Sequence, residues 1–155
     1  GDVYKRQQKI DRVKQTLRLG IISGVVITSS GFVICEFFPH AVSALFTDSD
    51  ELINLAVEGI RLAVLMFPFV GAQIVIGNFF QSIGKAKISI FLSLTRQLLY
   101  LLPCLLLFPQ WWGLKGVWIS MPVSDALAFV TAVISLMIYI KKVSKEHPIA
   151  NKVAE

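Results

Sequence analysis

Residues 62–84 read LAVLMFPFVGAQIVIGNFFQSIG, with no Asp, Glu, Lys or Arg among them. About 20 mostly apolar residues in a helix span the hydrocarbon core of a bilayer. Because lipid offers the backbone no hydrogen-bond partner, a stretch of this kind must be helical where it crosses a membrane. Residues 62–84 therefore predict a transmembrane helix. Three similar stretches occur in the chain, one before it and two after it.

These three further spans cover residues 19–38, 88–108 and 116–140. The connections between the four stretches are short, which makes consecutive helices antiparallel neighbours. The sequence lacks the alternating apolar and polar positions of a membrane β-barrel. We expect an all-α membrane protein with four antiparallel transmembrane helices.

The composition agrees with a lipid environment. Of the 155 residues, 55% are hydrophobic and 16% are charged, whereas soluble domains carry about 25% charged residues. The net charge is +5, but no basic face is interleaved with base-stacking aromatic residues. The sequence therefore argues against nucleic acid as a partner.

Basic residues gather at the ends that an antiparallel bundle places on one side. They are Lys9, Arg12, Lys14 and Arg18 before the first span, Lys85 and Lys87 after the second, and Lys141, Lys142, Lys145 and Lys152 after the fourth. The opposite side carries only Arg61 and Lys115. The positive-inside rule predicts that both termini are cytoplasmic. We expect the membrane to be the cell membrane of a bacterium.

The chain divides accordingly into four parts. Residues 1–7 (GDVYKRQ) look unrelated to the rest of the chain, and we interpret them as a non-native scar. Residues 8–18 form a basic cytoplasmic lead-in, 19–140 the transmembrane region, and 141–155 a basic cytoplasmic tail.

On the outer side we expect a short helix capped by Thr47 or Asp48 that leads into the second span. Trp111, Trp112 and Trp118 are expected near the outer membrane interface, where amphipathic rings prefer to lie.

Two charges interrupt the apolar spans. Arg96 lies about 13–14 Å from the cytoplasmic end of its span, and Asp125 about 15 Å from the outer end of the next span, at 1.5 Å per residue. Both depths are near the middle of the membrane, so we predict that the two side chains approach each other. Two roles stay open: a static ion pair that holds the helices together, and a pair that lines or gates a polar cavity.

Polar side chains also occur in the uncharged second span. Gln73, Asn78 and Gln81 lie roughly on one side of that helix. Hydrogen bonding between helices is favoured for any single one of them, and lining of a ligand cavity is the alternative.

Pro68, Pro103 and Pro122 each fall inside a span. A proline removes a backbone hydrogen bond and kinks a helix. Three kinked helices favour moving parts over a passive anchor.

The sequence offers no catalytic constellation. His, Cys and carboxylate residues have no metal-ligand spacing, no nucleophile accompanies a base, and no glycine loop could cradle a phosphate. We expect no enzyme, no metal and no cofactor.

Several stretches resemble the multidrug and toxic compound extrusion (MATE) transporter family. They are LFTDSDELINLAVEGIRL (45–62), FFQSIGKAKIS (79–89), the Arg96-Gln97 pair and GLKGVWISMPVSD (113–125). The resemblance implies the last four helices of a twelve-helix antiporter with two lobes, lacking its N-terminal lobe.

The resemblance also implies secondary active efflux of small organic cations in exchange for H⁺ or Na⁺, with a fragment of this size inactive alone. Some sodium-coupled relatives use an acid on the helix that corresponds to residues 62–84, and this chain has none there, so the coupling ion is left open. Two alternatives remain. The first is a flippase for lipid-linked precursors from the same superfamily, which would need cations in the membrane beyond Arg96. The second is a non-transporting scaffold subunit, which would not need the charges of Arg96 and Asp125 inside the membrane.

Overall fold

The computed structural model describes residues 2–146, with side chains described for residues 8–143 and for Lys145. Residues 147–155 of the expected cytoplasmic tail lie outside this range. Every element in the described range is a helix. The elements are α1 (Asp2–Phe37), α2 (Pro39–Ala44), α3 (Asp50–Ala63), α4 (Phe67–Ser82), α5 (Ala86–Leu94), the π-helix η1 (Thr95–Leu101), α6 (Leu102–Trp112) and α7 (Leu114–Glu146).

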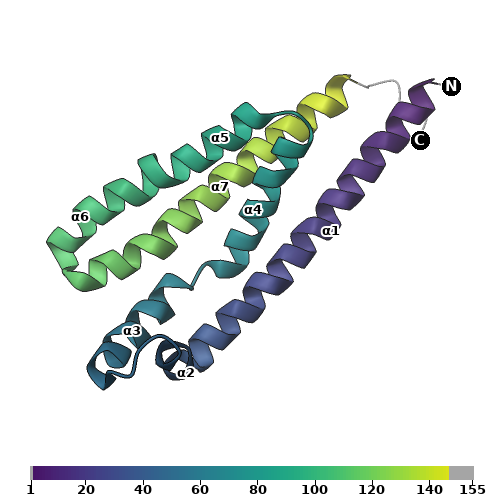
Figure 1. Cartoon of the computed structure of the whole chain (residues 1–155). Coiled ribbons are helices and arrows are strands. Elements are labelled where there is room, and N and C mark those ends of the chain that lie inside the picture. The colour runs from purple at the N-terminus through teal and green to yellow at the C-terminus, as the bar shows by residue number, and fades with distance from the viewer. Residues whose placement is uncertain (1, 147–155) are drawn as a thin grey trace.

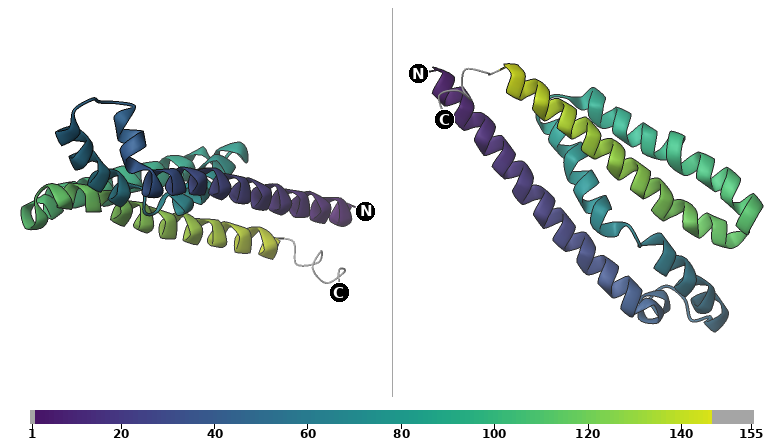
Figure 2. Two further views of the ribbon diagram at one scale, coloured as in Figure 1. Left: turned by 90° about the horizontal axis from the view of Figure 1, so that it is seen from below. Right: turned by 180° about the vertical axis from the view of Figure 1, so that it is seen from behind.

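The helices form an elongated bundle with α4 between α1 and α7 (Figure 1). α5, η1 and α6 make one continuous rod that lies along α7 (Figure 1). The start of α1, the α4–α5 turn and the end of α7 lie at one end of the bundle, and α2, α3 and the α6–α7 turn lie at the other (Figure 2). Consecutive long segments are therefore antiparallel.

Three helical segments are long and apolar enough to cross a membrane, namely Gln8–Phe37, Ala86–Trp112 and Leu114–Val143, and α3 with α4 can form a fourth, broken span. Large apolar side chains of these segments face outward. Phe69 is 43% exposed, Leu99 64% and Val130 53%. A water-soluble domain would bury such residues, whereas a bundle in lipid exposes them to hydrocarbon. The protein is an all-α membrane protein, as expected.

The second span differs from the single helix expected over residues 62–84. α3 ends at Ala63, α4 begins at Phe67, and the two helices are bent by 57°. Pro68 explains the break, because it has no N–H and its ring excludes the carbonyl of Val64, four residues earlier. The Val64 carbonyl instead accepts a hydrogen bond from the N–H of Phe67 at 3.0 Å. Pro68 thus breaks the span into two helices.

The other two prolines have different local effects. Pro103 is the second residue after η1, and the wider π-helical turns shift the carbonyls that an α-helical register would press against its ring. Pro122 lies within α7, which continues on both sides of it. A bend at Pro122 stays a prediction.

The outer end of the bundle differs from expectation in its cap. Ser49 caps α3 by accepting a hydrogen bond from the N–H of Leu52, whereas Thr47 accepts one from the N–H of Ser49. The prediction that Thr47 or Asp48 caps this helix was wrong by one or two residues, because Thr47 is used to shape the preceding turn. Trp118 packs against Gly59 of α3.

Two glycines let α1 and α4 touch backbone to backbone. A β-carbon on Gly71 would meet the Thr28 side chain and the backbone of Gly24, and one on Gly24 would lie 2.9 Å from Val75. Small residues at a helix crossing allow the close approach on which packing in membranes depends. The crossing lies four residues after the start of α4. It therefore fixes the first turns of α4, just after the break between α3 and α4, against α1.

This crossing gives a testable prediction. In the full-length protein that carries this chain, Gly71→Ala should lower the yield of folded protein and its thermal midpoint, because overpacking costs about 1–3 kcal/mol. Gly77→Ala on the same helix is the matched control, since a β-carbon there would meet only the Ser89 hydroxyl at 4.0 Å. Equal thermal midpoints for the two variants would contradict a tight crossing at Gly71.

Candidate functional site

Arg96 projects from η1, the π-helical part of the third membrane segment. The seven residues of η1 end at Leu101, two residues before Pro103 of α6, whose missing N–H favours a change of helical register here. Short π-helical segments within α-helices frequently occur at functional sites. Arg96, Gln97 and Tyr100 all belong to this segment.

Arg96 contacts Asp125 of α7, as the sequence suggested. The Nη2 atom of Arg96 donates a hydrogen bond to Oδ1 of Asp125 at 2.9 Å. The Asp125 side chain is 8% exposed and the Arg96 side chain 33%. The carboxylate is therefore enclosed, while the guanidinium still has one side open to its surroundings. Each charge supplies the partner that the other would lack in hydrocarbon.

The surroundings of Asp125 are small and polar. Ser120 and Ser124 are buried on α7, and their hydroxyls donate to the carbonyls of Gly116 and Met121 at 2.8 and 3.0 Å. Ala128 and Ala132 continue the same buried face at four-residue intervals. This row of small residues lets neighbouring helices approach α7 closely.

A second polar contact joins η1 and α7. The hydroxyls of Tyr100 and Thr131 lie 2.6 Å apart, and Thr131 also donates to the carbonyl of Leu127. Sequence reasoning missed this contact. Tyr100 lies four residues after Arg96 and hence on the same helix face, but nothing in the sequence selects Thr131 as its partner.

A polar pocket of about 240 Å³ adjoins the ion pair, between α4 and the α5–η1 rod. Gln73, Asn78 and Gln81 of α4 all line it, so the three polar residues singled out in this span face one space. Arg96 lines it as well. The structure thus brings four of the five polar candidates to a single pocket, and the fifth, Asp125, is bonded to Arg96.

The opposite wall of this pocket was not expected. It is formed by the polar side chains of Ser89, Ser93 and Gln97. Their four-residue spacing is a signal for one helix face that was available in the sequence, but isolated serines on an apolar helix are common.

Gln73 is the most enclosed polar residue of the pocket. It is 8% exposed, and its Oε1 atom is buried with no hydrogen-bond partner among the described residues. A buried amide without a partner costs free energy unless water or a ligand satisfies it. Gln73 therefore brings an unpartnered amide oxygen to the lining of the same pocket as Arg96.

The described residues indicate the class of protein. It is an all-α membrane protein with several membrane-spanning helices, an ion pair between two of these helices and a polar pocket beside the ion pair. The MatE family model matches residues 7–106. The chain belongs to the MatE family.

Two solved structures extend this assignment. One, described as the MATE multidrug transporter DinF-BH in complex with R6G, is 34% identical, with a TM-score of 0.76 over 83% of this chain. Another, named only "protein A", is 35% identical, with a TM-score of 0.75 over 81% of this chain. The chain spans 28% of the length of "protein A" and 29% of that of DinF-BH. A search of curated proteins gave no match.

Removing one member of the Arg96–Asp125 pair should destabilise the folded protein, because the other charge then lacks its partner. In the full-length protein, Arg96→Ala or Asp125→Ala should each reduce folded yield, because an unpaired buried charge costs about 3–5 kcal/mol. Lys115→Ala, which removes a charge in the first turn of α7, is the control. The charge swap Arg96→Asp with Asp125→Arg should restore folded yield. Normal yield and normal thermal midpoints in both single variants would contradict a stabilising pair.

Proposed function

We propose that this chain is part of a secondary active multidrug transporter that exports cationic, amphipathic compounds in exchange for H⁺ or Na⁺. The observation that carries the proposal is the polar pocket with its buried ion pair inside an otherwise apolar bundle. Membership of the MatE family and similarity to a multidrug transporter structure support it. A longer chain, with a second lobe from its N-terminal part, would complete the transport path.

The Arg96–Asp125 pair would gate the pocket in this mechanism. Helix α7 and the η1 segment are held together by the pair and by the Tyr100–Thr131 contact. A proton or Na⁺ at the Asp125 carboxylate would weaken its attraction for Arg96, and so would free the two helices to move apart. Energy from the ion gradient would then be coupled to a change in the shape of the pocket.

Exchange of organic cations fits the site better than movement of a lipid-linked pyrophosphate. Among the residues that line the pocket, Arg96 is the one cation, and Asp125 already neutralises it. A pyrophosphate would need further unpaired Lys or Arg side chains. A purely structural subunit, in turn, would gain nothing from the unpaired amide oxygen of Gln73.

The membrane orientation belongs to the same proposal. With Lys85, Lys87 and Lys142 on the cytoplasmic side, both termini of the chain lie in the cytoplasm of a bacterial cell. The polar pocket opens between α4 and α5, the two helices joined by the turn that carries Lys85. It would therefore lie in the cytoplasmic half of the bundle, where drugs enter for export.

Transport can be measured directly with R6G as the probe. In proteoliposomes, an imposed gradient of either H⁺ or Na⁺ should drive R6G across the membrane through the full-length protein, in exchange for the ion. Collapse of the gradient that drives this exchange should stop the movement of R6G. Arg96→Asp with Asp125→Arg should restore folding but not transport if the pair gates the pocket. Full transport by this double variant would leave the pair a structural role only, and lack of gradient-driven movement in the wild type would reject the proposed exchange.

The pocket itself is tested by Gln73. Gln73→Leu keeps the approximate volume but removes the unpartnered acceptor, so R6G transport should fall several-fold at unchanged folded yield. Gln110→Leu, on α6 and outside the pocket-lining residues, is the control. Unchanged transport in Gln73→Leu would mean that the Gln73 amide does not contact the transported compound or its water.

A further inference from the structure

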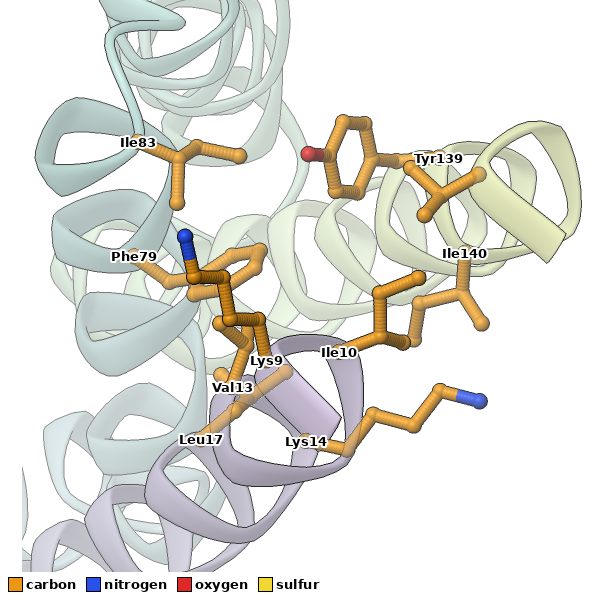
Figure 3. Close-up of a pocket in the computed structure, with 10 residues that line it drawn as sticks. Lys9, Ile10, Val13, Lys14, Leu17, Phe79, Ile83, Tyr139 and Ile140 are labelled. Carbon is orange, nitrogen blue, oxygen red and sulfur yellow. The ribbon is translucent and has the colours of Figure 1, made fainter. Parts of the chain in front are cut away.

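A second pocket, distinct from the polar one, lies at the end of the bundle that carries the start of α1 and the end of α7 (Figure 3). It has a volume of about 160 Å³. Its walls are apolar and come from three helices, with Val13 and Leu17 from α1, Phe79 from α4 and Ile83 just after it, and Ile140 from α7. This volume is smaller than the roughly 300–1,000 Å³ of a drug-sized site, and the apolar lining suits a segment of hydrocarbon chain.

Two walls of this pocket are anchored in the packed part of the bundle. Leu17 is buried and belongs to the same apolar cluster as Ile76 and Phe80 of α4. The Tyr139 ring lies 6.0 Å from the Phe79 ring and 5.7 Å from the Phe80 ring, both in edge-on geometry. These contacts join α1, α4 and α7 beside the pocket.

Polar groups stand at the rim of the pocket. Lys9 and Lys14 flank the apolar wall of α1, and in Figure 3 the Lys9 ammonium and the Tyr139 hydroxyl extend into the same space beside Ile83. Within the described part of the chain, neither Lys9 nor Tyr139 has a hydrogen-bond or ion-pair partner through these groups. Two hydrogen-bond donors, one of them a cation, are therefore available above an apolar slot.

The cationic rim continues on the far side of Tyr139. An adjoining cavity of about 390 Å³ shares Tyr139 and Val143 with the first pocket and is lined by Lys85 and Lys142. Asp11 is the one acidic residue of the 8–18 segment, and it is not among the residues that line either space. The lining residues of both cavities thus include four lysines and no carboxylate.

We propose that this lysine-rimmed pocket, formed by Lys9, Val13, Leu17, Phe79, Ile83 and Tyr139, binds an anionic phospholipid. One acyl chain lies between α1 and α4 along Val13, Leu17 and Phe79. The lipid phosphate accepts hydrogen bonds from Lys9 and the Tyr139 hydroxyl, and Lys142 contributes from the adjoining cavity. Basic pockets between transmembrane helices at the cytoplasmic surface are the setting in which anionic lipid headgroups are recognised. The site lies apart from the ion pair, and its occupancy does not depend on the proposed transport.

Charge complementarity and depth both select a lipid as the occupant. Lys85, in the turn after α4, marks the level at which the apolar helices end, which is where headgroups begin. α1 has 36 residues and is thus about 54 Å long, longer than the roughly 30 Å hydrocarbon core. Its Lys9–Lys14 part therefore lies at headgroup depth beside the end of α4.

The test is native mass spectrometry of the full-length protein in detergent, titrated with phosphatidylglycerol or with phosphatidylethanolamine of the same acyl chains. The first phosphatidylglycerol should bind more tightly than phosphatidylethanolamine. The double variant Lys9→Gln with Lys142→Gln should weaken phosphatidylglycerol binding by about tenfold or more, because both lysines attract the anionic headgroup. Phosphatidylethanolamine binding should change little.

The matched control is Lys87→Gln with Lys141→Gln, which removes two cations from the same end of the bundle but from neither cavity. Lys9→Arg with Lys142→Arg keeps both positive charges, so this variant should still prefer phosphatidylglycerol over phosphatidylethanolamine. That result would show that the site tolerates substitution at these positions. Val13→Trp should fill the slot and block the tight site without changing charge. If Lys9→Gln with Lys142→Gln and the control variant weaken phosphatidylglycerol binding equally, the effect comes from general surface charge. That result would overturn the proposal. No preference for phosphatidylglycerol in the wild type, as expected if another part of the longer chain covers the pocket, would overturn it too.

Discussion

The contact between Arg96 and Asp125 is the constraint on which the rest of this bundle depends. Two charges near the middle of apolar helices are tolerated only if they meet, and here they meet at 2.9 Å. Their meeting sets the rotation of the η1 segment relative to α7. That rotation in turn aims the face with Ser89, Ser93 and Gln97 toward α4, which closes the polar pocket. The ion pair thus joins the last two segments beside the polar pocket, together with the Tyr100–Thr131 contact.

Helix irregularities supply the geometry that this contact requires. Pro68 separates α3 from α4, so that α4 can pack against α1 through Gly24 and Gly71 while α3 packs separately on Trp118. Pro103 is preceded by a π-helical segment that carries Arg96 and Tyr100. In each case a proline that weakens local helical bonding lies next to a contact that specifies tertiary structure.

Much of this arrangement could be predicted from the sequence, because hydrophobicity and charge act over whole spans. The all-α membrane class followed from the uncharged runs, and the Arg96–Asp125 contact followed from two matching depths on antiparallel helices. The break at residues 64–66 did not, since a proline in an apolar run is compatible with a kink or with a complete interruption. Packing against neighbouring helices decides between them. The second wall of the pocket and the Tyr100–Thr131 contact were also missed, because they depend on the rotation of η1 after its change of register.

The energetic coupling between Arg96 and Asp125 in the full-length protein tests this account most directly. A double-mutant cycle of thermal or denaturant unfolding, with Arg96→Gln and Asp125→Asn singly and together, isolates the interaction from the effects of each side chain alone. We predict a favourable coupling free energy of about 1.5 kcal/mol or more, in the range measured for contacting charged partners. A coupling near zero, with the two single effects adding, would show that the two side chains do not interact in the membrane and would contradict the central claim.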